Sequence, residues 1–155
     1  MVVDIYFFYF VIFKLRVYNA KKKYYKIELP GNAEIHVYFE TANGLIIDFV
    51  VKLVLKVGTT YYELIRFDSA HGCPHKDILD VNGKSKKKVW FELLNNKQGL
   101  DLAVRDLKDN HEIYIERFKK WQAYSVRLRV MCQQKRGTHS RFSCKNLDLY
   151  WQSLK

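Results

Sequence analysis

The residues best suited to chemistry are concentrated in one short stretch near the middle of the chain. Seven titratable residues lie between positions 66 and 77: Arg66, Asp68, His71, Cys73, His75, Lys76 and Asp77. Gly72 and Pro74 interrupt the stretch, and both residue types favour a change of chain direction. Because side chains alternate along an extended segment, Arg66 and Asp68 are expected on one face, and a bend would return the two histidines towards them.

Three interpretations of this stretch stay open. In the first, Asp68, His71 and His75 are catalytic and act as general acid and base, as in metal-independent cleavage of RNA. Arg66 or Lys76 would then stabilise the charged phosphorane. In the second, His71, His75 and either Asp68 or Asp77 hold a divalent metal ion. In the third, Asp68 accepts backbone N–H groups of a turn and the histidines are polar surface. The spacing matches no established catalytic motif, and we predict no metal ion or other cofactor.

The chain carries a formal net charge of +11, and its basic residues are concentrated at both ends. Residues 14–26 hold six lysines and arginines and no acid, and residues 122–155 hold seven and a single acid. Residues 27–121 hold 14 of each and are neutral. Basic flanks can bind nucleic acid through its phosphates, and they can equally be solvated tails.

A run of lysines, Lys84 and Lys86 to Lys88, adjoins Asn82-Gly83. Lysines on an edge strand discourage pairing with other chains, and they could also form a rim that contacts phosphate. The candidate nucleic-acid-binding residues are therefore Arg66, Lys76, Lys86, Lys87 and Lys88.

Cysteine usage and the N-terminal segment bear on location. Three cysteines are poor material for a disulfide framework and favour a reducing compartment such as the cytoplasm. Cys132, His139 and Cys144 lack the fourth ligand of a structural zinc site. The apolar run over residues 2–13 is too short for a membrane span and resembles a buried strand, so no membrane partner is expected.

Alternating apolar residues and turn signals predict a series of antiparallel strands. Lys21-Lys-Lys23 is expected in a turn, and Asn43-Gly44 and Asn82-Gly83 are strong hairpin signals. The expected strands cover residues 24–29, 34–41, 45–57, 61–67, 78–81 and 89–94.

The pattern changes to a helical one over about residues 97–121. Apolar residues there step by three and four, with His111 in the same stripe. His111 either bonds a backbone carbonyl or faces the sheet near the other histidines. Beyond the helix, alternation over Ala123 to Cys132 indicates a further strand.

The predicted fold is therefore α+β, an antiparallel meander of five or six strands with one long helix packed across the sheet. With 155 residues the chain fits one such domain, which we place at residues 1–121. Residues 122–155 are a basic C-terminal extension.

The stretch Leu64 to Asp77 resembles a motif of small prokaryotic toxins of the TumE type and their relatives. The motif is Arg-Tyr-Asp-(Asn/Thr)-Ala-His-Gly followed by His-Lys or His-Arg, and Arg66 to Gly72 with His75-Lys76 match it here. The end of the helix, Tyr114 to Trp121, is also similar, so the resemblance covers about residues 34–121. This chain departs from the motif in having Phe67 where tyrosine is usual.

The resemblance implies a compact antiparallel sheet with a long helix and the toxin half of a two-gene toxin–antitoxin pair. Together with the acid–base interpretation, the resemblance leads us to expect a toxin that acts on RNA. We also expect an acidic antitoxin as its partner. The alternative is a non-enzymatic protein that binds nucleic acid or an antitoxin through its basic flanks. A homodimer is compatible with either.

Overall fold

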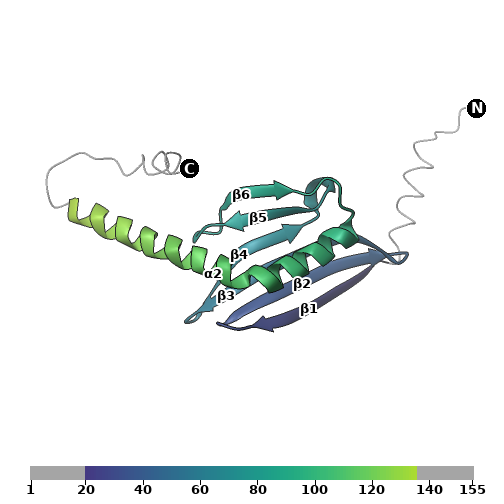
Figure 1. Ribbon diagram of the computed structural model, residues 1–155, viewed down its shortest axis with the longest axis horizontal. Coiled ribbons are helices and arrows are strands. Elements are labelled where there is room, and N and C mark those ends of the chain that lie inside the picture. The colour runs from purple at the N-terminus through teal and green to yellow at the C-terminus, as the bar shows by residue number, and fades with distance from the viewer. Residues whose placement is uncertain (1–19, 136–155) are drawn as a thin grey trace, which may run out of the picture. The chain divides into compact units, whose positions relative to one another are not determined.

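A computed structural model describes residues 20–135, which form a six-stranded sheet and one long helix (Figure 1). Each strand pairs antiparallel with its neighbour in the chain, in the order β1 to β6. The predicted α+β meander is confirmed. The elements are β1 (Lys21–Leu29), β2 (Ala33–Ala42), β3 (Leu45–Val57), β4 (Thr60–Asp68), the 3-10 turn η1 (Ala70–Gly72), β5 (His75–Leu79), β6 (Ser85–Trp90) and α2 (Asn96–Lys135).

The tight β2–β3 connection follows from its two turn residues. Asn43 and Gly44 have φ values of 51° and 77°, the left-handed pair that a two-residue type I′ hairpin requires. The turn fixes which residues of β2 and β3 face each other, and with them the face that each side chain occupies.

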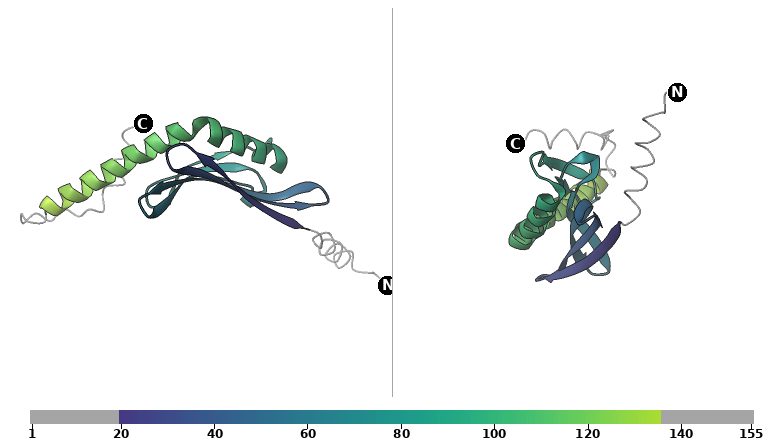
Figure 2. Two further views of the ribbon diagram at one scale, coloured as in Figure 1. Left: turned by 90° about the horizontal axis from the view of Figure 1, so that it is seen from below. Right: turned by 90° about the vertical axis from the view of Figure 1, so that its right-hand side faces the viewer.

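One face of the sheet packs on α2 (Figure 2). Alternate residues of the central strands are buried there, including Ile35, Val37, Val51, Leu53 and Ile65. The helix contributes a buried stripe made by Leu100, Ala103, Leu107, Tyr114, Ile115 and Phe118. Burying a large apolar side chain of this kind stabilises a fold by roughly 1.5–3 kcal/mol.

A close backbone approach seats the start of α2. A Cβ built on Gly99 would lie 2.6 Å from Cγ of Pro74 and 3.1 Å from Cζ of Phe49. Only glycine therefore fits at this position, and the helix begins directly over the residue that precedes β5.

Three local predictions are wrong. Lys21-Lys-Lys23 lies in β1 rather than in a turn. The last two strands run over His75–Leu79 and Ser85–Trp90, several residues before their predicted positions. Ala123 to Cys132 is part of α2 and not a strand.

The helix runs on because no glycine or proline separates residue 100 from Lys135, and extending an existing helix costs little. The predicted N-terminal strand over residues 2–13 and the zinc candidates His139 and Cys144 lie outside the described residues. Within residues 20–135, no helix has a stretch apolar enough to cross a membrane.

Candidate functional site

The second face of the sheet is opposite the buried helical stripe of residues 100–118 and carries polar and aromatic side chains. We call it the open face. Residues that pair directly on neighbouring strands project to the same side of the sheet. The strand register therefore arranges the central side chains of the open face in two adjacent rows, each running across all six strands. The first row is Tyr24, Tyr38, Val50, Asp68, His75 and Trp90. The second row is Lys26, His36, Lys52, Arg66, Asp77 and Lys88.

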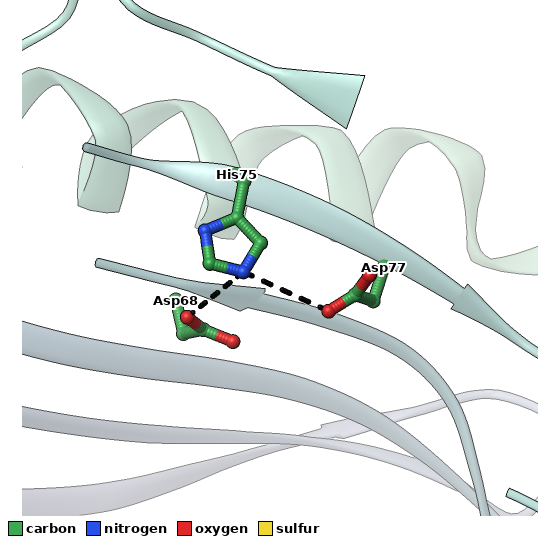
Figure 3. Close-up of side chains that lie close together, drawn as sticks. All are labelled: Asp68, His75 and Asp77. Atoms are coloured by element: carbon green, nitrogen blue, oxygen red, sulfur yellow. Dashed lines mark ion pairs between the residues drawn. The ribbon is translucent and has the colours of Figure 1, made fainter. Parts of the chain in front are cut away.

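Three members of these rows form a compact cluster, Asp68, His75 and Asp77 (Figure 3). Nε2 of His75 lies 3.1 Å from Oδ1 of Asp68 and 3.7 Å from Oδ2 of Asp77. The His75 side chain is 1% exposed, and the two carboxylates are 12% and 11% exposed. The imidazole is thus enclosed, while each aspartate keeps a small accessible surface.

The orientation of His75 is set by its other nitrogen. Nδ1 lies 3.3 Å from the carbonyl oxygen of Cys73, which can only accept a hydrogen bond, so Nδ1 carries a proton. Nε2 then either carries the second proton of an imidazolium and donates to Asp68, or presents a lone pair between two carboxylates.

The connection between β4 and β5 holds Asp68 in place. Oδ1 of Asp68 accepts the backbone N–H of Ala70 at 3.0 Å. The Ser69 hydroxyl donates to Asp48 and accepts the N–H of Phe49 at 2.9 Å, which fastens the connection to β3. Asp68 is therefore held by the connection itself, and the connection is held by β3.

His71 lies in the same connection but in a different environment. It is exposed and has φ 66°, in the left-handed region that is unfavourable for most side chains. Its ring centroid lies 5.9 Å from that of His75 and 6.4 Å from that of Trp90. His71 is thus the accessible imidazole beside the enclosed one.

The Asp77 carboxylate has two partners on β6. Oδ1 accepts the Ser85 hydroxyl at 2.8 Å, and Oδ2 accepts the Lys88 ammonium at 3.2 Å. Burial by itself would raise the pKa of Asp77, but these two hydrogen bonds outweigh it and hold the pKa below its usual value. Asp77 is accordingly a carboxylate at neutral pH.

Trp90 closes the cluster on the β6 side. Its ring lies 4.7 Å from the His75 ring, and the Lys88 ammonium lies 5.0 Å from its centroid. The indole is 44% exposed, so it shields His75 on one side and offers its remaining surface to solvent.

A cleft of about 530 Å³ opens on the other side of Asp68. Its lining comes from both rows, from Asp48 of β3 and from the β4–β5 connection: Tyr38, Asp48, Val50, Lys52, Arg66, Asp68 and Ala70. Lys52 and Arg66 both reach Glu63, at 3.0 and 2.6 Å. The cleft thus brings two cations and the carboxylates of Asp48 and Asp68 to one open surface.

The structure unites some predicted site residues and separates others. Arg66, Asp68, His75 and Lys88 share the open face, as the alternation predicts for the first two. Lys76 faces α2 instead, where its ammonium donates to Asp106 at 3.2 Å and to Tyr114 at 3.1 Å. Its side chain is 15% exposed, so it belongs to the helix–sheet interface.

Lys86 and Lys87, two further candidates for nucleic-acid binding, also lie apart from the cluster. Lys86 pairs with Asp80 at 3.4 Å, and Lys87 is exposed and alternates away from the open face. His111 bonds the carbonyl of Lys108 at 2.8 Å on α2, which agrees with the simpler of its two interpretations.

Sequence reasoning missed Trp90 and the two rows. Trp90 lies 13 residues beyond Asp77, the end of the polar stretch. Only the pairing of β5 with β6 brings it next to His75. Asp77 was predicted only as an alternative metal ligand, and its place beside His75 follows because residues two positions apart on a strand share a face.

Residues 19–124 match the family described as a domain of unknown function, DUF7718. The chain therefore belongs to this family. The matched range begins earlier than residues 34–121, over which the chain resembles the TumE-type toxins, and includes β1. No curated protein matches the chain, and no solved structure matches it.

Proposed function

We propose that this protein is the toxin component of a toxin–antitoxin pair and cleaves RNA on the open face of its sheet. The observation that carries the proposal is the pair of adjacent rows across that face. One row offers exposed aromatic rings at Tyr24, Tyr38 and Trp90, which are 48%, 40% and 44% exposed. The other offers four lysines and arginines along the same line.

Aromatic rings beside a line of cations suit single-stranded RNA. Unpaired bases stack on such rings, and the phosphates between them are attracted to the cations. Tyr24 and Tyr38 already stack on each other, with centroids 4.5 Å apart. A strand of RNA lying along the rows would pass over the cleft beside Asp68.

The reaction that fits this arrangement is transfer of the phosphodiester to its own 2′-oxygen. Asp68 takes the proton of the 2′-hydroxyl, the 2′-oxygen bonds to phosphorus, and the bond to the 5′-oxygen breaks. His71 supplies the proton for that leaving oxygen. His75, being enclosed, positions Asp68, and Arg66 stabilises the charge on the phosphorane.

The test is growth after induced expression, together with cleavage of single-stranded RNA by the purified protein. The informative variants are Asp68→Asn and His71→Asn, because asparagine tolerates the left-handed backbone that His71 adopts. Lys87→Ala, an exposed lysine off the open face, is the control. We expect the wild type and the control to arrest growth and cut RNA, and the two variants to do neither.

Two outcomes would overturn the proposal. One is an Asp68→Asn, His71→Asn double variant that folds and remains as toxic as the wild type. The other is a folded wild-type protein that neither arrests growth nor cleaves RNA.

The second candidate function is binding of nucleic acid or of an acidic antitoxin without catalysis. The exposed Lys21, Lys22 and Lys23 on the edge strand β1 favour it. Such binding would survive Asp68→Asn but weaken steeply as salt rises, because it depends on the release of counterions.

A further inference from the structure

We propose that Asp68, His75 and Asp77 together bind one divalent metal ion. Each residue offers one ligand atom, and the three atoms lie within 4.8 Å of one another. The inference concerns the residues of the proposed active site but does not depend on RNA being the substrate.

The histidine is prepared for such a role. Because its Nδ1 proton is held by the Cys73 carbonyl, Nε2 is the free ligand atom of the neutral imidazole. Metal-ligating histidines usually have such a partner on their second nitrogen, which fixes the tautomer and the ring orientation. Nε2 points between the two carboxylates, as Figure 3 shows.

The carboxylates are fixed in the same manner. Asp68 is held by the N–H of Ala70, and Asp77 by the hydroxyl of Ser85. Hydrogen bonds of this kind orient ligating carboxylates and reduce the ordering that binding would otherwise require.

The local charge favours a cation. Asp68 and Asp77 bring two negative charges to a site that is largely removed from water, and Lys88 is the one lysine or arginine among the described residues with an ion pair to either. The Lys88 side chain is 33% exposed, so its ammonium can leave Asp77 without unfolding the site. A divalent ion bound by Asp77 would replace that ammonium.

The donor set indicates the class of metal. One imidazole nitrogen and two carboxylate oxygens suit Mn²⁺, Mg²⁺ or Zn²⁺ and lack the thiolates that soft metals prefer. Three protein ligands leave coordination positions for water or for a phosphate oxygen, which is the arrangement of catalytic sites. When bound, the ion would supply a Lewis acid and a more acidic water at the position where Asp68 otherwise acts as base.

Direct titration tests the inference. The full-length protein, first treated with a chelator, is titrated with MnCl₂, and binding is followed by the Mn²⁺ electron paramagnetic resonance signal and by calorimetry. We expect one Mn²⁺ per chain. Asp77→Asn and His75→Gln should weaken binding at least about tenfold. Asp109→Asn, which removes an exposed helix carboxylate, should leave it unchanged.

Lys88→Ala gives a result that misfolding cannot imitate. Because the competing ammonium is gone, we expect tighter Mn²⁺ binding than in the wild type. The inference is overturned if the folded wild type binds no Mn²⁺ at millimolar concentration, or if Asp77→Asn binds as tightly as the wild type.

The outcome is separable from the test of RNA cleavage. Mn²⁺ binding by a protein that cuts no RNA would refute the proposed reaction and leave the metal site standing. Absence of Mn²⁺ binding by a protein that cuts RNA would refute the metal site alone.

Discussion

Asp68 and His75 are direct partners across the β4–β5 ladder, and Nε2 of the histidine lies 3.1 Å from Oδ1 of the aspartate. Two positions along the ladder, the pair Arg66 and Asp77 lies on the same face. Backbone pairing therefore brings together the acid, the imidazole and the cation, and their distances depend on strand register rather than on a mobile loop.

The two histidines of the site should differ in their effect on stability. His75→Ala leaves two aspartates close together without the imidazole between them, so we expect the free energy of unfolding to fall by roughly 1–3 kcal/mol. His71→Asn should be nearly neutral, because His71 is exposed and asparagine suits its positive φ. Urea denaturation at pH 7 measures both. Equal effects of the two substitutions would contradict the roles assigned here.

Aromatic stacking on the open face can be tested with a pair of tyrosines. Tyr38→Ala should weaken binding of a single-stranded RNA by about 1–3 kcal/mol, the usual value of one stacked base. Tyr25 is a matched control, because it has a similar exposure of 43% and alternates to the opposite side of β1. Fluorescence anisotropy with labelled RNA is the measurement, and equal losses from the two substitutions would refute a specific track on the open face.

Lys76 should act on folding and not on nucleic acid. Its ammonium joins Asp106 and the Tyr114 hydroxyl, which itself donates to Asp106 at 2.6 Å. Burial and this bond to Asp106 raise the pKa of Tyr114 well above its usual value. Removing Lys76 leaves the Asp106 carboxylate without its cation.

We therefore expect Lys76→Ala to lower the free energy of unfolding by about 1–3 kcal/mol in chemical denaturation. Lys87→Ala should change it by less than about 0.5 kcal/mol, as is usual for exposed positions. RNA affinity per folded molecule should be the same in both. A stable Lys76→Ala protein with weakened RNA binding would restore the phosphate-contact hypothesis.

Gly99→Ala should destabilise the protein, although alanine is ordinarily better than glycine in a helix by about 1 kcal/mol. The added methyl group would overlap the Pro74 ring, which cannot rotate away. Glu116→Ala, at an exposed helix position, is the control and should be neutral or slightly stabilising. Thermal denaturation compares the two, and an increase in Tm for Gly99→Ala would show that α2 does not lie this close to Pro74.

Asp80 should give stability that depends on pH. Burial by itself would raise its pKa, but the N–H groups of Lys84 and Asn82 and the Lys86 ammonium together lower it below 3.8. Because the folded pKa is lower than the unfolded one, this stabilisation is present above the unfolded pKa and is lost as pH falls through the folded pKa.

Asp80→Ala should accordingly cost about 1–3 kcal/mol in urea denaturation at pH 7. The difference from the wild type should begin to shrink below about pH 4, where the Asp80 carboxyl of the unfolded chain becomes protonated, and should be lost as pH falls through the lower pKa of the folded protein. A difference that stays constant between pH 7 and pH 3 would assign the effect to side-chain packing instead of charge.

Local chemistry predicted much of the fold. Asn43-Gly44 dictates a two-residue hairpin, and the alternation of β3 identifies its buried face from Phe49 to Leu55. These features depend on neighbouring residues alone, so they can be read from sequence.

The predicted strand positions were wrong where the local sequence is compatible with either a turn or a strand and pairing with neighbouring strands determines which one forms. His75 to Asp77 follows Gly72 and Pro74 and resembles a turn, but pairing with both β4 and β6 makes it a strand. On a strand, Lys76 lies between the open-face residues His75 and Asp77, so its side chain must point to the opposite face, towards the helix. Lys76 is therefore not the phosphate contact that was predicted. The residues of the candidate site were identified by type, whereas the position of Asp77 beside His75 and the contact of His75 with Trp90 required the strand register.

The order of the strands has a consequence for how the molecule is made. Since every ladder joins consecutive strands, each hairpin can form as soon as its second strand leaves the ribosome, and loops to be closed are short. Chains with such local pairing fold faster than those with distant pairing. Asp68, His75 and Asp77 all belong to the single β4–β5 hairpin, so the strand pairing that brings them together involves no residue of α2, which follows later in the chain.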